Sequence, residues 1–247
     1  MNKLLIAILV SCALVTGQEK PPANRRNFIA CPIIRDTKTL PCWLAEYEGE
    51  TYFLGLQGSS ASEFYPPQLN HEVLVEGTIT NEPRICGGIP LKALRISVLP
   101  EINRACNTLL PAEDGMEAPN FPAKRFTDDM RKPGTDTETR EFIVPFDFDN
   151  DYLTFHTTKI VSEAARVAKA IKVAKIEVTG YRATTWLSNG KKFIEVESIA
   201  EKRAKKVGEI MVGLGFSNAS VNWKSEPEPC DGVTDAQKRR VTISLKP

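Results

Sequence analysis

Apolar and polar residues alternate in short runs through the first part of the chain, from Phe28 to about Leu110. In EVLVEGTIT (72–80) valine and isoleucine alternate with glutamate and threonine, and KALRISVLP (92–100) alternates again, which predicts half-buried strands. CWLAEYEGETYFLGLQ (42–57) has apolar residues on both sides of Glu48-Gly49-Glu50 and predicts a hairpin. About five short strands without a long helix predict a small closed β-barrel of the OB type over residues 28–111.

Two segments lack a regular pattern of apolar residues. Residues 18–27 are polar, with two prolines and two arginines, and predict a flexible leader. Residues 112–140 are dominated by proline, glycine and charged residues, which predicts a linker. Because a structureless stretch of this length is uncommon inside one compact core, we expect it to separate two domains.

The second half of the chain, residues 141–247, alternates between strand and helix periods. Helical spacing of apolar residues predicts two helices, at 157–174 and at 194–216. The predicted strands are 141–149, 175–179, 219–225 and 239–245. The order β-α-β-α-β-β predicts an α+β domain with its helices on one face of a mixed sheet.

The charge balance argues against two classes of partner. The net charge of the 247 residues is +1, so nothing global favours nucleic acid or a membrane surface. OB-like barrels bind nucleic acid through aromatic residues in a basic groove. Here Trp43, Tyr47 and Tyr52 are interleaved with acidic residues. We therefore expect no nucleic-acid partner.

The N-terminus has the pattern of a secretory signal. Met1-Asn2-Lys3 is a short basic start, and LLIAILVSCALV (4–15) is an uncharged stretch too short for a comfortable membrane span. The small residues that end at Gly17 suit ordinary cleavage. LVSC (9–12) is also the pattern of a bacterial lipobox, in which Cys12 becomes the lipidated N-terminus. Both alternatives predict export to the periplasm, and lipidation would add the outer membrane as a partner.

Export would place the remaining cysteines in an oxidising compartment. Four of them, Cys31, Cys42, Cys86 and Cys106, lie in the first half and predict two disulfides. We favour the local pairings, Cys31–Cys42 and Cys86–Cys106, although four cysteines allow three connectivities. Cys230 is left over, as a buried free thiol or as an intermolecular link.

Little in the chain predicts catalysis or a metal. There is no CxxC, G-x-S-x-G or H-E-x-x-H pattern, and the only histidines, His71 and His156, are isolated. Asp147, Asp149 and Asp151 alternate along a predicted strand, which favours a solvated face over a metal site. We predict a non-enzymatic protein without a cofactor.

Four segments of the second half coincide in order with one family pattern. FDFDND (146–151) is similar to an opening strand, and IEVTG (176–180) to a strand that carries G-H-T-D. SIAEKRAKKVGEIMVGLGF (198–216) is similar to an L-S-x-x-R-A-x-x-V helix, and QKRRVTISL (237–245) to an N-R-R-V closing strand. Residues 141–247 therefore resemble the OmpA-like peptidoglycan-binding domain. The first half resembles no family securely.

The resemblance implies a ligand, the peptide stem of peptidoglycan, which offers a carboxylate and an ammonium on one carbon. The arginine of R-A, Arg203 here, would take the carboxylate with two parallel hydrogen bonds. Ala183 stands where the family has the aspartate that takes the ammonium. The residues that the resemblance places at the peptidoglycan site are Arg203, Tyr181, Arg182, Asp149, Ile199 and Arg239.

The missing aspartate leaves three explanations open. Another acid, Glu195, Glu197 or Asp149, replaces the aspartate. Alternatively, the ligand has no amino group that the protein binds, or the domain no longer binds the cell wall. The first hypothesis is therefore a non-enzymatic envelope protein that anchors to peptidoglycan, with an envelope protein as partner of its N-terminal domain. The alternative is an envelope assembly or interaction subunit whose OmpA-like domain has lost wall binding.

Overall fold

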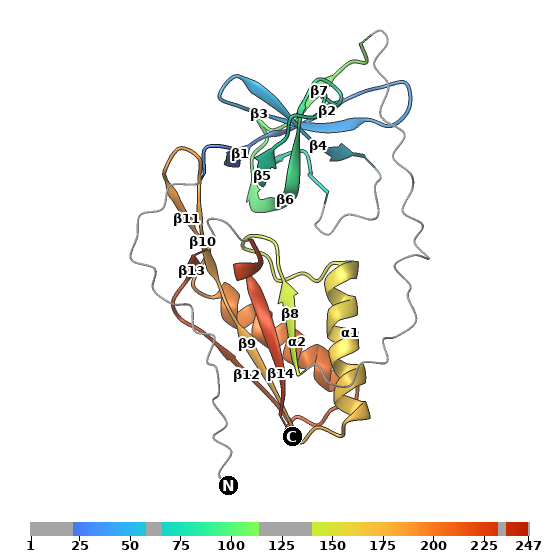
Figure 1. Ribbon diagram of the computed structural model, residues 1–247, viewed down its shortest axis with the longest axis vertical. Coiled ribbons are helices and arrows are strands. Elements are labelled where there is room, and N and C mark those ends of the chain that lie inside the picture. The colour runs from blue at the N-terminus through green and yellow to red at the C-terminus, as the bar shows by residue number, and fades with distance from the viewer. Residues whose placement is uncertain (1–21, 58–65, 114–139, 232–235, 247) are drawn as a thin grey trace.

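The computed structural model describes residues 22–57, 66–113, 140–231 and 236–246 (Figure 1). We call residues 22–113 the N-terminal half and residues 140–246 the C-terminal half. The predicted signal, Cys12 and nearly all of the predicted linker lie outside the described residues. In the part of the chain that the structure describes, no helix has the length and apolar character needed to cross a membrane.

The described residues of the N-terminal half form strands only. The strands are β1 (Arg25–Ala30), β2 (Pro32–Arg35), β3 (Cys42–Tyr47), β4 (Glu50–Leu56), β5 (His71–Ile79), β6 (Ile89–Ile102) and β7 (Thr108–Leu110). The predicted β3–β4 hairpin is present, and Glu48 and Gly49 in its turn both have positive φ, as a tight two-residue connection requires. β1 begins within the segment that the sequence predicts as a leader.

These seven strands pair in the linear order β1-β5-β6-β4-β3-β2-β7. The closed barrel predicted from the sequence is therefore not supported. β1 and β2 belong to different ladders: β1 pairs with β5, whereas β2 pairs with β3 and β7. Cys31 alone separates the two strands.

Two disulfides stabilise this half, but neither local pairing is correct. The bonds are Cys31–Cys106 and Cys42–Cys86. The pairing of Pro32 with Ala45 and of Arg35 with Cys42 explains the error. This antiparallel register puts Cys31 about four residues, or roughly 13 Å, from Cys42, which is too far for a disulfide.

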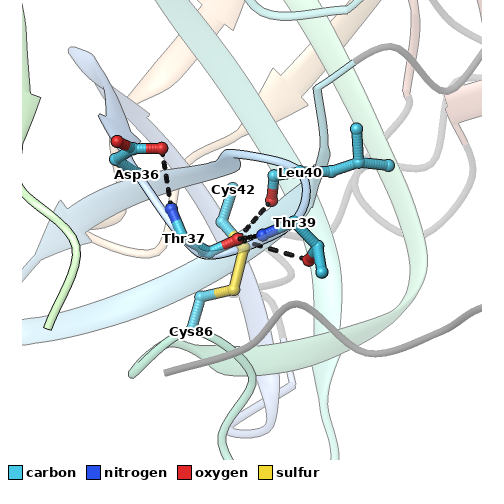
Figure 2. Close-up of a disulfide and its surroundings, with 6 residues drawn as sticks. All are labelled: Asp36, Thr37, Thr39, Leu40, Cys42 and Cys86. Carbon is cyan, nitrogen blue, oxygen red and sulfur yellow. Dashed lines mark hydrogen bonds between the residues drawn. A yellow bond between two sulfur atoms is a disulfide. The ribbon is translucent and has the colours of Figure 1, made fainter. Parts of the chain in front are cut away.

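Figure 2 shows the Cys42–Cys86 bond beside the loop Asp36–Leu40. The Thr37 hydroxyl donates to the carbonyl of Leu40 and accepts from the amide of Thr39, so the loop is internally hydrogen-bonded. Elsewhere in the chain, Cys230 is buried and disulfide-bonded. The buried free thiol that the sequence left open is therefore wrong.

The C-terminal half combines two helices with two sheets, so the α+β class is confirmed. The main sheet has the order β12-β9-β14-β8, formed by β8 (Glu141–Pro145), β9 (Lys175–Gly180), β12 (Val221–Ser225) and β14 (Arg240–Lys246). β9 and β12 are parallel and the other pairs are antiparallel, so the sheet is mixed. A three-residue 3₁₀ turn, η1 (Ala236–Lys238), precedes β14.

Helices α1 (Phe155–Ala170) and α2 (Ile199–Gly213) cover one face of this sheet and contact each other. Thr154 caps α1, because its hydroxyl accepts from the amide of Thr157. The apolar sides of both helices pack on the inward side chains of the sheet. The fully buried members of this core include Ala164, Ala168, Ile176, Val178, Ala204, Val207, Met211, Val241 and Ile243.

The sequence did not predict the second, small sheet. Its strands are β10 (Ala183–Trp186), β11 (Lys192–Ile194) and β13 (Cys230–Asp231), in the order β11-β10-β13. β10 and β11 form a hairpin within the segment expected as a loop. α2 consequently begins at Ile199, five residues later than predicted, because Ile194 pairs with Thr184.

The two halves contact each other closely, and in Figure 1 the β10–β11 hairpin rises beside β1. The Asn27 side chain donates to the carbonyl of Trp186 at 2.9 Å, and the amide of Ser188 donates to the carbonyl of Asn27 at 2.7 Å. Beside these bonds an apolar cluster joins side chains from both halves. Its members are Ile29, Leu74, Leu99, Phe148, Leu187 and Phe193.

Candidate functional site

Arg203, the arginine expected to bind a ligand, is fully buried on α2. Its guanidinium donates to the carbonyls of Asn150, Tyr181 and Asp147 at 2.9, 3.1 and 2.8 Å. The two remaining N–H groups bond the Glu195 carboxylate at 3.0 and 2.5 Å. A guanidinium has five N–H donors, so no donor of Arg203 is left for a ligand.

Glu195 is equally saturated. Besides Arg203, its Oε1 accepts from the amide of Asp149 at 2.9 Å and its Oε2 from the amide of Ala183 at 2.8 Å. Four hydrogen bonds fill the lone-pair sites of a carboxylate. Both side chains of the ion pair are fully buried. The parallel two-bond geometry is that of an arginine holding a carboxylate ligand, and here the protein supplies the carboxylate itself.

The strand and turn before Ala183 place this pair. β9 ends at Gly180, where a Cβ atom would lie 2.0 Å from the carbonyl oxygen of Ala200 and 3.0 Å from the Cβ of Ala204. Only glycine permits this close approach of β9 to the first turns of α2. The chain then turns so that the carbonyl of Tyr181 and the amide of Ala183 face Arg203 and Glu195.

Gly180→Ala is expected to destabilise the protein by about 1–3 kcal/mol, because overpacking forces backbone shifts. Gly213→Ala is the control, since Gly213 ends α2, the helix that Gly180 approaches, and a Cβ there meets nothing within 4 Å. Urea unfolding followed by circular dichroism measures both. Equal midpoints for the two variants would contradict the close approach.

Three further residues of the predicted site make contacts within the protein itself. The Tyr181 ring is buried beneath the Arg240 guanidinium, 4.6 Å away, and burial raises the pKa of its hydroxyl. The Arg182 side chain donates to the carbonyls of Glu195 and Pro227. Ile199 is buried in the first turn of α2.

Asp149 lies beside the Arg203–Glu195 pair without contacting the guanidinium through its carboxylate. Its Oδ1 accepts from the amide of Val196 at 2.7 Å. Burial, followed by the negative charge of Glu195, raises the pKa of the Asp149 carboxyl. Asp149 also has a φ of 47°, a left-handed conformation that is uncommon outside glycine.

The three aspartates of FDFDND do not form the solvated strand face predicted for them. β8 ends at Pro145, so the segment that follows is a turn. Asp147 is buried, and its carboxylate lies 3.3 Å from Arg95 of the N-terminal half. Asp151 instead pairs with Lys206 at 3.1 Å. Among the described residues no group of His, Cys, Asp or Glu has the arrangement of a metal site.

Arg239, the last residue predicted for the site, lies elsewhere, at the contact between the halves. Its guanidinium holds the Glu76 carboxylate of β5 with bonds of 3.1 and 2.5 Å, and both side chains are fully buried. The Thr185 hydroxyl lies between them, accepting from Arg239 and donating to Glu76. Burial lowers the pKa of Arg239, but the charge and hydrogen bonds of Glu76, together with the charges of Glu195 and Asp147, raise it by more, so the pKa is raised overall.

An open cavity of about 370 Å³ lies between the halves beside Asp149. Its N-terminal wall is largely apolar, with Val98, Leu99 and Pro100 of β6 next to His71. The His71 Nδ1 bonds the carbonyl of Leu99 at 2.8 Å. Its opposite wall is the chain from Asp149 to Tyr152.

Sequence reasoning missed Glu76, and only one local signal pointed to it. Glu76 alternates with Val73 and Val75, and this pattern predicts that its side of β5 faces solvent. Leu74, however, lies on the same side as Glu76 and is fully buried. An apolar residue on this otherwise polar side of β5 indicated that another part of the protein covers that side. Thr185 and the carbonyls around Arg203 carried no such sign.

The C-terminal half is thus a two-helix α+β unit whose arginine site is filled by the protein's own glutamate. No protein-family model and no curated protein is significantly similar to the chain. Among solved structures, the chain is similar to the OmpA-like domain of FopA1 from Francisella tularensis. The identity is 18%, and the match covers 42% of this chain and 70% of that one with a TM-score of 0.34.

Two more solved structures match a similar share of the chain. The periplasmic domain of Helicobacter pylori MotB is 15% identical, with 43% of this chain and 78% of that one covered and a TM-score of 0.34. The cell wall anchor of the T6SS from Pseudomonas aeruginosa covers 43% of this chain and 82% of its own length, with a TM-score of 0.31. The chain therefore resembles OmpA-like domains over part of its length, as its sequence predicts.

Proposed function

We propose that the protein is an envelope interaction or assembly subunit whose OmpA-like domain does not clamp a peptidoglycan stem at Arg203. The observation that carries this proposal is the saturation of Arg203. All five N–H groups have protein acceptors, and two of these are the oxygens of Glu195. A stem carboxylate would have to displace a buried carboxylate that makes four hydrogen bonds.

The competing proposal is peptidoglycan anchoring through Arg203, Tyr181, Arg182, Asp149, Ile199 and Arg239. Of these residues, Arg203 and Arg239 each hold an internal acid, and Ile199 is buried in α2. Anchoring therefore needs Glu195 to leave the guanidinium before a ligand binds. Removing one partner of a buried charge pair costs about 3–5 kcal/mol, which is large against a weak affinity for the wall.

We also propose a periplasmic location and a division into two domains, 28–111 and 141–247, joined by a linker at 112–140. The support is the signal pattern at the N-terminus together with two disulfides, which form in oxidising compartments. Lipidation at Cys12 would add the outer membrane as a partner. An envelope protein remains the proposed partner of the N-terminal domain.

The OB-type barrel is likewise a proposal. β1 and β2 are separated by Cys31 alone, and β4 and β6 pair in parallel. If β1 and β2 are counted as one bent strand, the order β2-β3-β4-β6-β5-β1 returns to its starting strand. A five-stranded barrel that is partly open has this property.

Co-sedimentation with purified sacculi tests the function. We expect the wild-type protein to stay in the supernatant, because Arg203 has no free donor. Retention that is lost in Arg203→Gln but kept in Lys202→Gln would overturn the proposal and support anchoring. Lys202 is an exposed cation next to Arg203 on α2, so it controls for nonspecific charge. The fold of each variant is checked by circular dichroism.

A further inference from the structure

The short segment Asp147–Asn150 contacts both halves of the molecule. Toward the N-terminal half, the Asp147 carboxylate lies 3.3 Å from Arg95, and the Phe148 amide donates to the Ser97 hydroxyl at 2.8 Å. Ser97 is fully buried, and both N-terminal partners belong to β6. The first two residues of the segment are therefore held by the docked N-terminal half.

The same segment also holds the Arg203–Glu195 pair. The carbonyls of Asp147 and Asn150 accept from the Arg203 guanidinium at 2.8 and 2.9 Å. The Asp149 amide donates to Glu195 at 2.9 Å. Three of the hydrogen bonds that saturate the ion pair thus come from four consecutive residues.

Phe148 connects the segment to the second buried ion pair. Its ring stacks on Phe193 at 4.3 Å between centroids, and the Arg239 guanidinium lies 5.8 Å from its centroid. Arg239 in turn holds Glu76 of the N-terminal half. One side chain of the segment therefore packs against the docking contact while its neighbours support Arg203.

The conformation of the segment depends on these contacts. Asp149 is left-handed, with φ at 47°, and a residue other than glycine keeps such a conformation only where its surroundings hold it. The open cavity of about 370 Å³ lies directly beside Asp149 and Asn150, so the segment has room to move on that side. If the N-terminal half withdraws, the segment loses its bonds to β6 and is free to relax.

We propose that Asp147–Asn150 couples the docking of the two halves to the closure of the Arg203–Glu195 pair. A partner that draws the halves apart loosens the pair and presents a guanidinium to an external carboxylate. The docked N-terminal half thus keeps the Arg203 guanidinium of the same chain paired with Glu195. Such coupling is reciprocal, so opening the pair loosens the docking by the same factor.

Hydrogen exchange of single amides in the full chain tests the coupling. Glu76→Gln weakens docking at Arg239 without removing any hydrogen bond of the segment. The reporters are the amides of Asp149 and Ala183, which donate to Glu195. We expect both to exchange at least tenfold faster in Glu76→Gln. In the reverse test, Glu195→Gln should accelerate the Asn27 and Ser188 amides at the contact between the halves.

Leu44→Ala is the control, because Leu44 is fully buried in β3 but belongs to a cluster away from the contact. It should leave the reporter amides unchanged. Ser188→Ala is a milder variant should Glu76→Gln not fold, since it removes only the bonds of one hydroxyl, which accepts from the Asn27 amide and donates to the Arg25 carbonyl. Faster exchange at the amide of residue 188, with unchanged exchange at Asp149 and Ala183, would overturn the coupling. Sacculus binding is a separate readout, so the two proposals fail independently.

Discussion

Replacing Glu195 by alanine is expected to destabilise the folded protein by about 3–5 kcal/mol, because it leaves the buried charge of Arg203 without its counter-ion. The free energy of unfolding in urea measures the effect. Glu209→Ala is the control, on the same helix as Arg203: its carboxylate is exposed and lies 3.9 Å from Lys205. Removing such a surface pair changes stability by about 1 kcal/mol or less.

Adding a small carboxylate tests whether the loss of stability comes from the missing counter-ion. In Glu195→Ala the vacated space faces two guanidinium N–H groups and the amides of Asp149 and Ala183. Acetate should therefore raise the midpoint of Glu195→Ala, while equal chloride should not, and the wild-type protein should respond to neither. A loss no larger than that of Glu209→Ala, or a wild-type response to acetate, means that Arg203 is already accessible and removes the basis of the proposed function.

Arg239→Ala is expected to cost a similar amount, about 3–5 kcal/mol, since it leaves the Glu76 carboxylate buried and unpaired. It should also separate the unfolding of the two halves, because this pair crosses their contact. Calorimetry would then record one transition for the wild type and two for the variant, the expected departure from two-state behaviour.

A double replacement isolates the charge from the packing. Glu76→Leu combined with Arg239→Met keeps apolar volume at the contact and should be less destabilising than Arg239→Ala, since buried ion pairs are often replaceable by apolar residues. Lys246→Ala, at the exposed far end of β14, should have little effect. A single transition in Arg239→Ala at the wild-type temperature would show that the pair does not hold the halves together.

The sequence predicted the elements of the main sheet well and the β10–β11 hairpin not at all. β9 and β14 have clear alternation and lie within one residue of their predicted bounds. The hairpin at 183–194 is stabilised partly by contacts with Asn27, some 160 residues away. Local periodicity carries no information about such a partner.

The candidate site was likewise predicted only in part. Arg203 was found because its place on an apolar helix face and the family pattern agree. Glu195 was named only as one of three acids, because sequence spacing does not tell which carboxylate turns inward. The predicted disulfides were wrong because they joined cysteines that are neighbours in sequence. The register of β2 and β3 separates Cys31 from Cys42.

The Glu76–Arg239 pair also sets the order in which the chain completes its fold. The two residues are 163 positions apart, and ribosomes add about 5–20 residues per second. Glu76 therefore emerges roughly 10–30 s before its partner exists, and during that interval its carboxylate stays hydrated. Pairings this distant also slow folding. Docking of the two halves is thus a late event, because it requires the residue that precedes the last strand.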